Sequence, residues 1–318
     1  MLRGAGFPGE AATWLREWAA LAGLPILAEV EHTHVRPWGA VLRGATEQGH
    51  IYLKVCGPSQ AFEPALTALL ARFDTDAVMP KLLATHASQP WMLLGDGGVR
   101  LIDAPSRERL EVWRSILPRY ARLQRRLEGH EADLLGVGVP DLRLERLAPL
   151  LDSVIDDEPG FHLDRPDPFA PTYARLRELH PQVRHMVDEL GLLGIGPTIQ
   201  HDDLHQNNVL VRDGRAVVID WGDACVSHPF LSLWIVRCAV ALGAGVEDAG
   251  GAVTSLIDRY LEAWGDVAPM RELRRAADLG AALGEVSRAL TQYRIFALYP
   301  EVAPPAGAQG SGPRGGMR

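Results

Sequence analysis

Residues 208–221 constrain the fold most strongly. Two short runs of strand-forming residues, VLV and AVVID, flank the tetrapeptide Arg212-Asp213-Gly214-Arg215. An Asp-Gly pair between two such runs is a strong signal for a tight β-hairpin. Because the second half of the chain otherwise has helical periodicity, we expect an isolated hairpin in a helical setting. Such a hairpin returns Asp220 to the neighbourhood of Asn208.

The segments on either side of this hairpin are rich in polar residues. The loop QHDDLHQNN precedes it and DWGD follows it. Oxygen ligands such as Asn208 and Asp220 suit Mg²⁺, which usually takes one or two carboxylates and leaves its other positions to water and phosphate oxygens. Asp203, upstream on the same loop, could accept the proton of a substrate hydroxyl during phosphate transfer. These residues predict a phosphoryl-transfer site with Asp203 as the catalytic base.

The N-terminal region, residues 1–96, predicts a mixed α/β unit. We expect a helix over 10–21 and a second one over 59–73. Between them, period-two patterns predict three antiparallel strands, ILAEVEH (26–32), GAVLRG (39–44) and HIYLKV (50–55). The segment WMLLGDGGVRLI (91–102) indicates a strand, a break and another strand.

Residues 97–300 predict a mainly helical unit. Helices are expected over 106–127, 142–155, 172–193, 230–242, 253–264 and 271–298. Four arginines of the first of these helices are expected to form its solvated face: Arg119, Arg122, Arg125 and Arg126. Residues 156–171 indicate an acidic loop, and residues 301–318, rich in Gly, Pro and Ala, indicate a disordered tail.

The composition excludes several classes of protein. The 318 residues are 47% hydrophobic and 23% charged, as in a globular protein, and the net charge of −8 gives no general attraction to nucleic acid. Three cysteines without a C-x-x-C pair indicate neither a disulfide framework nor a zinc site. The longest stretch free of charged residues is 14 residues, too short to span a bilayer. We expect a soluble, cytoplasmic protein without a nucleic-acid or membrane partner, and its oligomeric state stays open.

The two polar motifs resemble a known enzyme family. HDDLHQNNVLV and VVIDWGDA are similar to the H-G-D-x-H-x-x-N and I-D-W signatures of aminoglycoside phosphotransferases and choline kinase-like enzymes, which share the protein kinase fold. The resemblance implies a bilobal α+β fold with a small β-rich lobe and a larger helical lobe. It also implies that Asp203 is the catalytic Asp, that Asn208 and Asp220 hold Mg²⁺, and that His201 packs the loop.

The same resemblance implies a nucleotide site for ATP or GTP. Lys54 on the third expected strand would hold the phosphates, and it stands out because the chain has 30 arginines and only one other lysine, Lys81. Glu63 is the one acidic residue between Lys54 and Asp74, so it is the candidate partner of that lysine. Residues 94–98 occupy the place of the hinge between the lobes. Gly39, in the short Arg36–Gly39 segment, is the candidate contact in the phosphate loop.

The sequence departs from the family pattern at three places. Asp202 replaces the usual Gly, the phosphate loop lacks G-x-G-x-x-G, and Ser232 replaces an Asp found in many relatives. None of these changes removes the base or a metal ligand. The expected acceptor is a hydroxyl of a small molecule: an aminoglycoside-like antibiotic, an amino alcohol or a sugar. A cationic acceptor would suit the carboxylates of Asp202 and Asp223.

Two alternatives of other classes remain open. One is a catalytically silent kinase-like module that binds nucleotide and recognises a partner protein. The other is a metal-dependent phosphohydrolase, in which His201, Asp202 and His205 would bind a transition metal with help from His180 or His185. The hairpin after Asn208 argues against the phosphohydrolase, because that chemistry uses an all-helical setting.

Overall fold

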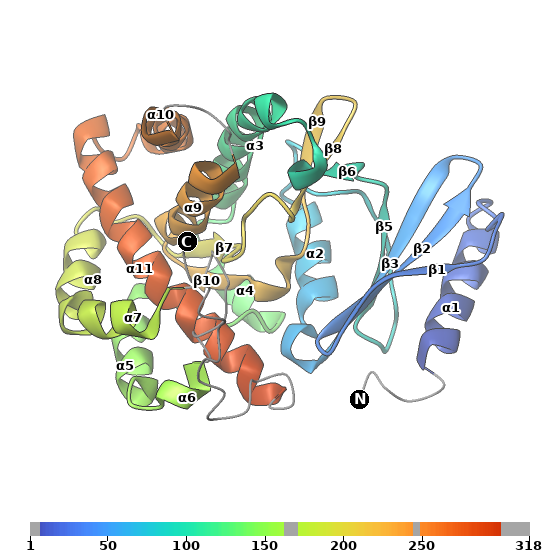
Figure 1. Cartoon of the computed structure of the whole chain (residues 1–318), viewed down its shortest axis with the longest axis horizontal. Helices are drawn as coiled ribbons and strands as arrows, with labels where there is room; N and C mark the ends of the chain where they lie inside the picture. Colours follow the sequence, from blue (N-terminus) through green and yellow to red (C-terminus); the bar gives the residue numbers. More distant parts are fainter. Residues whose placement is uncertain (1–6, 162–170, 244–248, 300–318) are drawn as a thin grey trace, which may run out of the picture.

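A five-stranded antiparallel sheet forms the N-terminal part of the structure (Figure 1). We analysed a computed structural model that describes residues 7–161, 171–243 and 249–299. The sheet has the strand order β1-β2-β3-β5-β4. Its strands are β1 (Glu31–Arg36), β2 (Gly39–Thr46), β3 (Gly49–Cys56), β4 (Leu82–Thr85) and β5 (Trp91–Gly95).

The expected strands two and three are present, but the first was placed wrongly. It runs over Glu31–Arg36 instead of 26–32, and every residue of β1 is exposed. Without a buried face the strand has no apolar alternation, and the apolar residues that suggested the earlier position, Ile26 and Val30, instead pack on the sheet core before the strand begins. Strand β4 was not expected, because four residues, three of them partly buried and one exposed, are too few to show a period.

Two helices pack on different sides of this sheet (Figure 1). Helix α1 (Phe7–Leu21) contributes Ala11, Leu15 and Ala19 to the sheet's own apolar core. Helix α2 (Glu63–Ala71) begins later than expected, after a single 3₁₀ turn at Pro58–Gln60. Its apolar residues join the core of the larger C-terminal part, so α2 carries side chains from the N-terminal region into the other half of the molecule.

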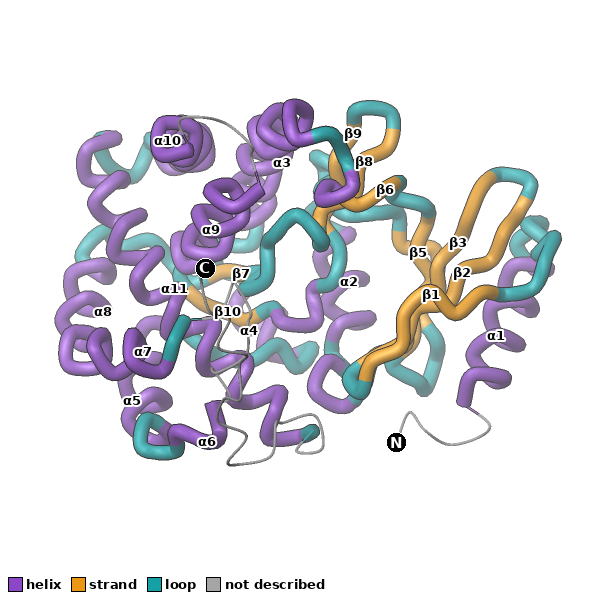
Figure 2. Tube along the Cα trace, viewed as in Figure 1, coloured by secondary structure: helices purple, strands orange, loops and turns teal. Residues whose placement is uncertain are grey.

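Helices make up most of the chain after Arg100 (Figures 1 and 2). They are α3 (Ser106–Arg126), α4 (Glu131–Gly136), α5 (Leu144–Val154), α6 (Glu158–Phe161), α7 (Tyr173–Leu179), α8 (Val183–Gly191), α9 (Leu233–Gly243), α10 (Ala249–Leu261) and α11 (Met270–Leu298). The helix expected over 172–193 is interrupted by a 3₁₀ turn at His180–Gln182, because Pro181 lacks an amide N–H. Residues 162–170 of the expected acidic loop and the expected tail, 301–318, lie outside the described residues.

The arginines of α3 form the expected solvated face only in part, because Arg122 is exposed whereas Arg119, Arg125 and Arg126 are partly buried. Arg119 donates to the carbonyl oxygens of Asp76, Ala77 and Ala216, and is half-buried. Arg122 and Arg126 both pair with the carboxylate of Asp76. The helix face that carries these side chains therefore binds the loop after α2 and the hairpin strand beside it.

The expected hairpin is confirmed, and it lies next to the end of the N-terminal sheet. Strands β8 (Val209–Arg212) and β9 (Arg215–Val218) pair with Arg212 opposite Arg215, and Asp213 and Gly214 both have positive φ, as a tight I′ turn requires. Strand β6 (Val99–Arg100) joins their outer edge. Strands β7 (Thr198–Gln200) and β10 (Cys225–Ser227) form a separate pair that lies among the helices (Figure 2).

Within the described ranges, no helix combines the length and the apolar character that crossing a membrane requires.

Candidate active site

The loop between β7 and β8 is anchored through its buried histidine. His201 Nε2 lies 2.9 Å from the carbonyl oxygen of Ile219, and its Nδ1 accepts from the backbone N–H of Asp203. The backbone N–H of His201 donates to the hydroxyl of Tyr120 at 3.0 Å. Burial lowers the pKa of His201, which favours the neutral ring that these two contacts use. The loop is thus fixed against the strand that leads to Asp220.

Asp203 and Asn208 contact each other within this loop. The Asn208 side-chain N–H₂ donates to the Asp203 carbonyl oxygen at 2.9 Å and to Asp203 Oδ2 at 2.8 Å. This arrangement occupies the amide nitrogen of Asn208 and leaves its oxygen as the atom that can bind a cation. Ile219 N–H donates to the Asn208 carbonyl, so the hairpin ladder carries Asp220 back toward Asn208.

Neighbouring side chains hold Asp203 in its ionised form. Burial acts to raise the pKa of Asp203, but the guanidinium of Arg288 and then the imidazole of His205 outweigh it and bring the pKa to about 2. Arg288 Nη2 lies 2.8 Å from Asp203 Oδ1, and His205 Nε2 lies 3.3 Å from Oδ2. Asp203 therefore carries a negative charge at neutral pH and can accept a hydrogen bond from an approaching hydroxyl.

Lys54 lies between two carboxylates from distant segments. Its Nζ is 2.6 Å from Glu63 Oε1 and 2.5 Å from Asp220 Oδ1. Glu63, the first residue of α2, is fully buried and also accepts the backbone N–H of Trp221 at 2.9 Å. Glu63 is thus the partner of Lys54 that the sequence predicted. The contact between Lys54 and Asp220 connects β3 of the N-terminal sheet to the residues just after β9.

The charges of this cluster offset the cost of burying it. Burial acts to lower the pKa of Lys54, but Asp220 and Glu63 outweigh burial and the pKa is raised. For Asp220, Lys54 likewise outweighs burial and lowers the pKa, whereas burial dominates at Glu63 and raises its pKa. A mostly buried lysine that stays charged beside a partly exposed carboxylate can exchange that carboxylate for a phosphate group.

The donor set fits a magnesium ion. The side chain of Asp220 is 45% exposed. Lys54 contacts only its Oδ1, so Oδ2 is left for a cation. Its backbone has φ +65° and ψ +60°, a left-handed conformation that Asp tolerates better than most residues and that is found at functional sites. Asp220 and the amide oxygen of Asn208 are of the chemical type that Mg²⁺ takes from proteins, one or two hard oxygen ligands beside phosphate and water.

The other expected nucleotide contacts lie at strand ends. Gly39 opens β2 after a two-residue turn, and a Cβ there would lie 3.0 Å from the Val55 carbonyl oxygen, so its lack of a side chain is explained by close packing on β3. Residues 94–98 connect the N-terminal sheet to β6. At Gly98, with φ +96°, a Cβ would lie 2.1 Å from the Val211 carbonyl oxygen.

Asp202 and Ser232, two of the residues that depart from the family pattern, are hydrogen-bonded to other side chains of the protein. Asp202 has φ +59°, a backbone for which Gly is the usual choice, and its buried carboxylate accepts from Gln200 and Thr291. Burial raises the pKa of Asp202 to about 7. The hydroxyl of Ser232 lies 2.8 Å from that of Tyr120, the residue that receives the His201 N–H. The carboxylate of Asp202 therefore faces into the fold and is already hydrogen-bonded there.

A buried arginine that no sequence motif marks lies beside the catalytic-loop carboxylate. Arg288 of α11 contacts Asp203, and its Nη1 donates to Asp223 Oδ2 at 2.7 Å and to the Asp202 carbonyl oxygen at 3.2 Å. Asp223 Oδ1 accepts from Gln60 at 3.1 Å, so both oxygens of Asp223 are occupied. Nothing in the helical spacing of α11 distinguishes Arg288 from the other arginines. A cationic acceptor would have to compete with these partners for Asp202 and Asp223.

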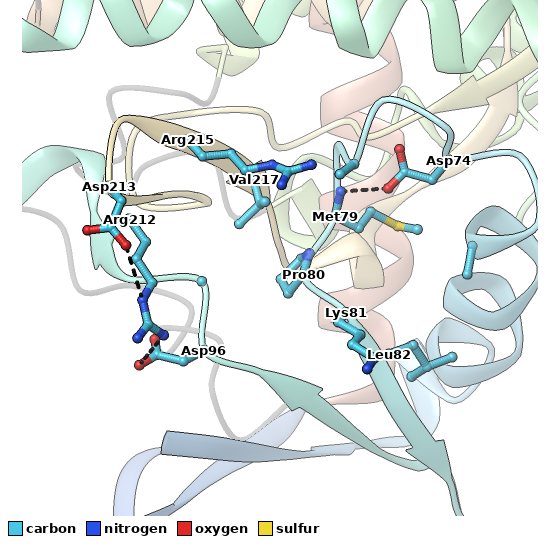
Figure 3. Close-up of a pocket in the computed structure, with 13 residues that line it drawn as sticks. Asp74, Met79, Pro80, Lys81, Leu82, Asp96, Arg212, Asp213, Arg215 and Val217 are labelled. Atoms are coloured by element: carbon cyan, nitrogen blue, oxygen red, sulfur yellow. Dashed lines mark hydrogen bonds and ion pairs between the residues drawn. The ribbon is translucent and has the colours of Figure 1, made fainter. Parts of the chain in front are cut away.

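A separate pocket of about 660 Å³ lies behind the hinge (Figure 3). It is lined by residues from the loop before β4, from the hinge and from the β8–β9 hairpin, and none of Lys54, Asp203 or Asp220 takes part. The chain's second lysine, Lys81, is exposed and lines this pocket. Lys81 therefore lies outside the cluster that holds Lys54.

Comparison with known proteins decides the family. A model of the phosphotransferase enzyme family, abbreviated APH, matches residues 40–279. The chain belongs to this family. The matched region runs from β2 to the first part of α11 and includes the Lys54 cluster and the Asp203 loop. Membership confirms the predicted enzyme class, a small-molecule phosphotransferase with a hydroxyl acceptor. None of the curated proteins matches the chain.

Solved structures of this phosphotransferase's fold confirm the bilobal α+β architecture. A macrolide 2′-phosphotransferase type I is similar with a TM-score of 0.56 and 16% identity, over 94% of this chain and 93% of that one. An aminoglycoside-3′-phosphotransferase of type VIII gives 0.51 and 19%, over 87% and 98%. An ethanolamine kinase from Plasmodium vivax gives 0.50 and 11%, over 86% and 82%. At these identities the likeness concerns the fold.

Proposed function

We propose that the protein transfers the γ-phosphate of ATP or GTP, with Mg²⁺, to a hydroxyl group of a small molecule. The observation that carries this proposal is the contact of Lys54 with both Glu63 and Asp220, 2.5–2.6 Å from each. It brings a phosphate-binding cation to the residue expected to hold the metal. An aminoglycoside-like antibiotic, an amino alcohol and a sugar are the acceptor classes to test.

In the proposed mechanism each side chain has a separate task. Lys54, oriented by Glu63, would bind the α- and β-phosphates, and Asn208 and Asp220 would hold Mg²⁺, which would supply charge neutralisation of the phosphates. Asp203 accepts the hydrogen bond of the acceptor hydroxyl and takes its proton as the hydroxyl oxygen bonds to the γ-phosphorus. The bond from that phosphorus to the β,γ-bridging oxygen breaks, and the nucleoside diphosphate leaves. Because phosphoryl transfer depends mainly on alignment and charge neutralisation, the fixed geometry of these groups supplies most of the effect.

The geometry argues against the phosphohydrolase alternative. Both ring nitrogens of His201 are occupied by backbone groups, and the carboxylate of Asp202 is buried against Gln200 and Thr291. Within the described ranges, no group of three or more His, Cys, Asp or Glu side chains is arranged to hold a metal. A magnesium site that relies on one carboxylate, one amide and phosphate oxygens is compatible with that arrangement.

The test combines nucleotide binding with turnover. We expect Mg²⁺-ATP, at about 100 times its Kd, to stabilise the wild-type protein by about 2.7 kcal/mol in a thermal melt. Asp203→Ala should keep this stabilisation but lose turnover with every acceptor of a hydroxyl panel, whereas Lys54→Met should lose both. GTP serves as the comparison nucleotide.

The outcomes separate the proposal from the silent-module alternative. Binding of Mg²⁺-nucleotide without transfer to any acceptor would favour the silent module. Normal turnover of Asp203→Ala would remove the proposed base, and a melt unchanged by either nucleotide would contradict the nucleotide site itself.

A further inference from the structure

Arg288 joins the two segments that carry the candidate catalytic groups. Its guanidinium contacts the Asp203 carboxylate and the Asp202 carbonyl oxygen on the loop after β7. Its other contact, Asp223, ends the short turn that begins directly after Asp220. The side chain is 8% exposed, so these contacts are made away from bulk water.

The two oxygens of Asp203 have different partners. Oδ1 forms an ion pair with Arg288 Nη2 at 2.8 Å, whereas Oδ2 accepts from the Asn208 side chain at 2.8 Å and lies 3.3 Å from His205 Nε2. A carboxylate with a single partner turns easily about its last side-chain bond, because that rotation has only broad minima. Partners on both oxygens fix the plane of the group and therefore the direction of the lone pairs that remain for an acceptor hydroxyl.

From these contacts we propose that Arg288 is a positioning residue for phosphoryl transfer. It orients the Asp203 carboxylate and, through its contact with Asp223, fixes the position of this carboxylate relative to the segment that carries Asp220. The inference rests on the proposed function. A guanidinium suits this task because its planar fork can contact two carboxylates and a carbonyl at once, which the single ammonium of lysine cannot do.

The contact network extends from Arg288 into the N-terminal region. Asp223 accepts from Gln60, which lies in the turn between β3 and α2, a few residues from Lys54 and Glu63. The chain of contacts Gln60–Asp223–Arg288–Asp203 thus connects the segment after the lysine strand with the base. A shift of one part of the site is transmitted to the other through this polar chain.

The decisive variant is Arg288→Lys, which keeps the charge but not the fork. We expect kcat to fall roughly tenfold or more, because small misplacements of a catalytic group are costly, while the KM for ATP stays within about twofold. Transfer is measured with Mg²⁺-ATP and the acceptor that gives the highest turnover with the wild-type protein. The matched control is Arg274→Lys, on the same helix as Arg288. Arg274 makes a two-point ion pair with Asp258 of α10, and its substitution should leave kcat unchanged.

Chemical rescue supplies a readout that a merely structural role would not change. In Arg288→Ala, millimolar guanidinium should restore part of the lost kcat by entering the space between the two carboxylates, while an equal concentration of NaCl should not. If Arg288→Ala fails to fold, Arg288→Lys alone carries the test.

Each outcome decides something different. A wild-type protein that transfers no phosphate would contradict the proposed function and with it this role. An active wild type together with a fully active Arg288→Lys would overturn the role of Arg288 alone. Loss of ATP binding in parallel with kcat would make Arg288 a structural residue and would likewise overturn its positioning role.

Discussion

Asp202 shows how one residue can satisfy a backbone requirement and create an electrostatic cost. Its φ of +59° is easiest for glycine, and its carboxylate is buried with a pKa raised to about 7. The folded protein therefore holds a proton on Asp202 at pH values where the unfolded chain, with an ordinary value of 3.8, has released it. As the pH rises from about 4 to about 7, this group makes unfolding progressively easier.

We expect Asp202→Asn to remove this pH dependence. The amide stays neutral, so the difference in unfolding free energy between the variant and the wild type should shift in favour of the variant by up to roughly 4 kcal/mol between pH 4 and pH 7. Thermal melts of both proteins at about pH 4 and pH 7 measure this shift. Other titrating groups cancel in the difference, and parallel pH curves would contradict a buried, proton-binding Asp202.

At the same scale, the sequence identified site residues that lie close to one another along the chain and missed those whose partners lie far away along the chain. Asp203, Asn208 and Asp220 lie within 18 positions of one another, so a hairpin was enough to place them together. Arg288 contacts Asp203 across 85 positions of sequence, and its burial depends on how α11 packs. No spacing rule selects it among 30 arginines.

At the scale of elements, the connection between β5 and β6 depends on the absence of a side chain. Gly98→Ala would place a Cβ against the Val211 carbonyl oxygen in a left-handed backbone. We expect a loss of about 3 kcal/mol of unfolding free energy, from conformational strain and from the displacement of β8.

Gly214 is the matched control for that change. It also has positive φ, +74°, but nothing lies within 4 Å of an added Cβ, so Gly214→Ala should lose only about 1 kcal/mol, from strain. Chemical denaturation measures both values. Equal losses at the two positions would show that the contact with Val211 does not matter.

Element boundaries were predictable where one face is buried and not elsewhere. Strands β2 and β3 alternate between buried and partly exposed residues along most of their length, and the period-two pattern found them. Strand β1 has no buried face, and β7 and β10 have three residues each, so their positions depend on pairing partners that the sequence does not reveal. The arginines of α3 mislead for a related reason, because their carbonyl and carboxylate partners come from other segments.

At the scale of the whole molecule, α11 forms a second connection between the two regions. Its Arg294 donates to the Ser59 carbonyl oxygen at 2.9 Å, and the hydroxyl of Tyr299, just after the helix, accepts from Ser59. The Tyr299 ring packs against Trp38, in the turn before Gly39, with ring centroids 6.3 Å apart. The end of α11 therefore contacts both the turn before α2 and the expected phosphate loop.

We expect Arg294→Ala to loosen this connection without unfolding either region. Hydrogen exchange should become several-fold faster in peptides covering residues 57–63 and the last two turns of α11, since both lose a tertiary contact. Arg274→Ala, on the same helix but paired with Asp258, is the control. Unchanged exchange in residues 57–63 would show that Arg294 does not hold the turn before α2.

The different environments of the two lysines have a practical consequence. Lys54 is 13% exposed and bound to two carboxylates, whereas Lys81 is exposed beside the pocket behind the hinge. An amine-reactive dye applied under mild conditions would therefore modify Lys81 and the chain terminus and spare Lys54. With the terminus blocked, the native chain accepts a single fluorophore next to the junction of its two regions, without any engineered cysteine.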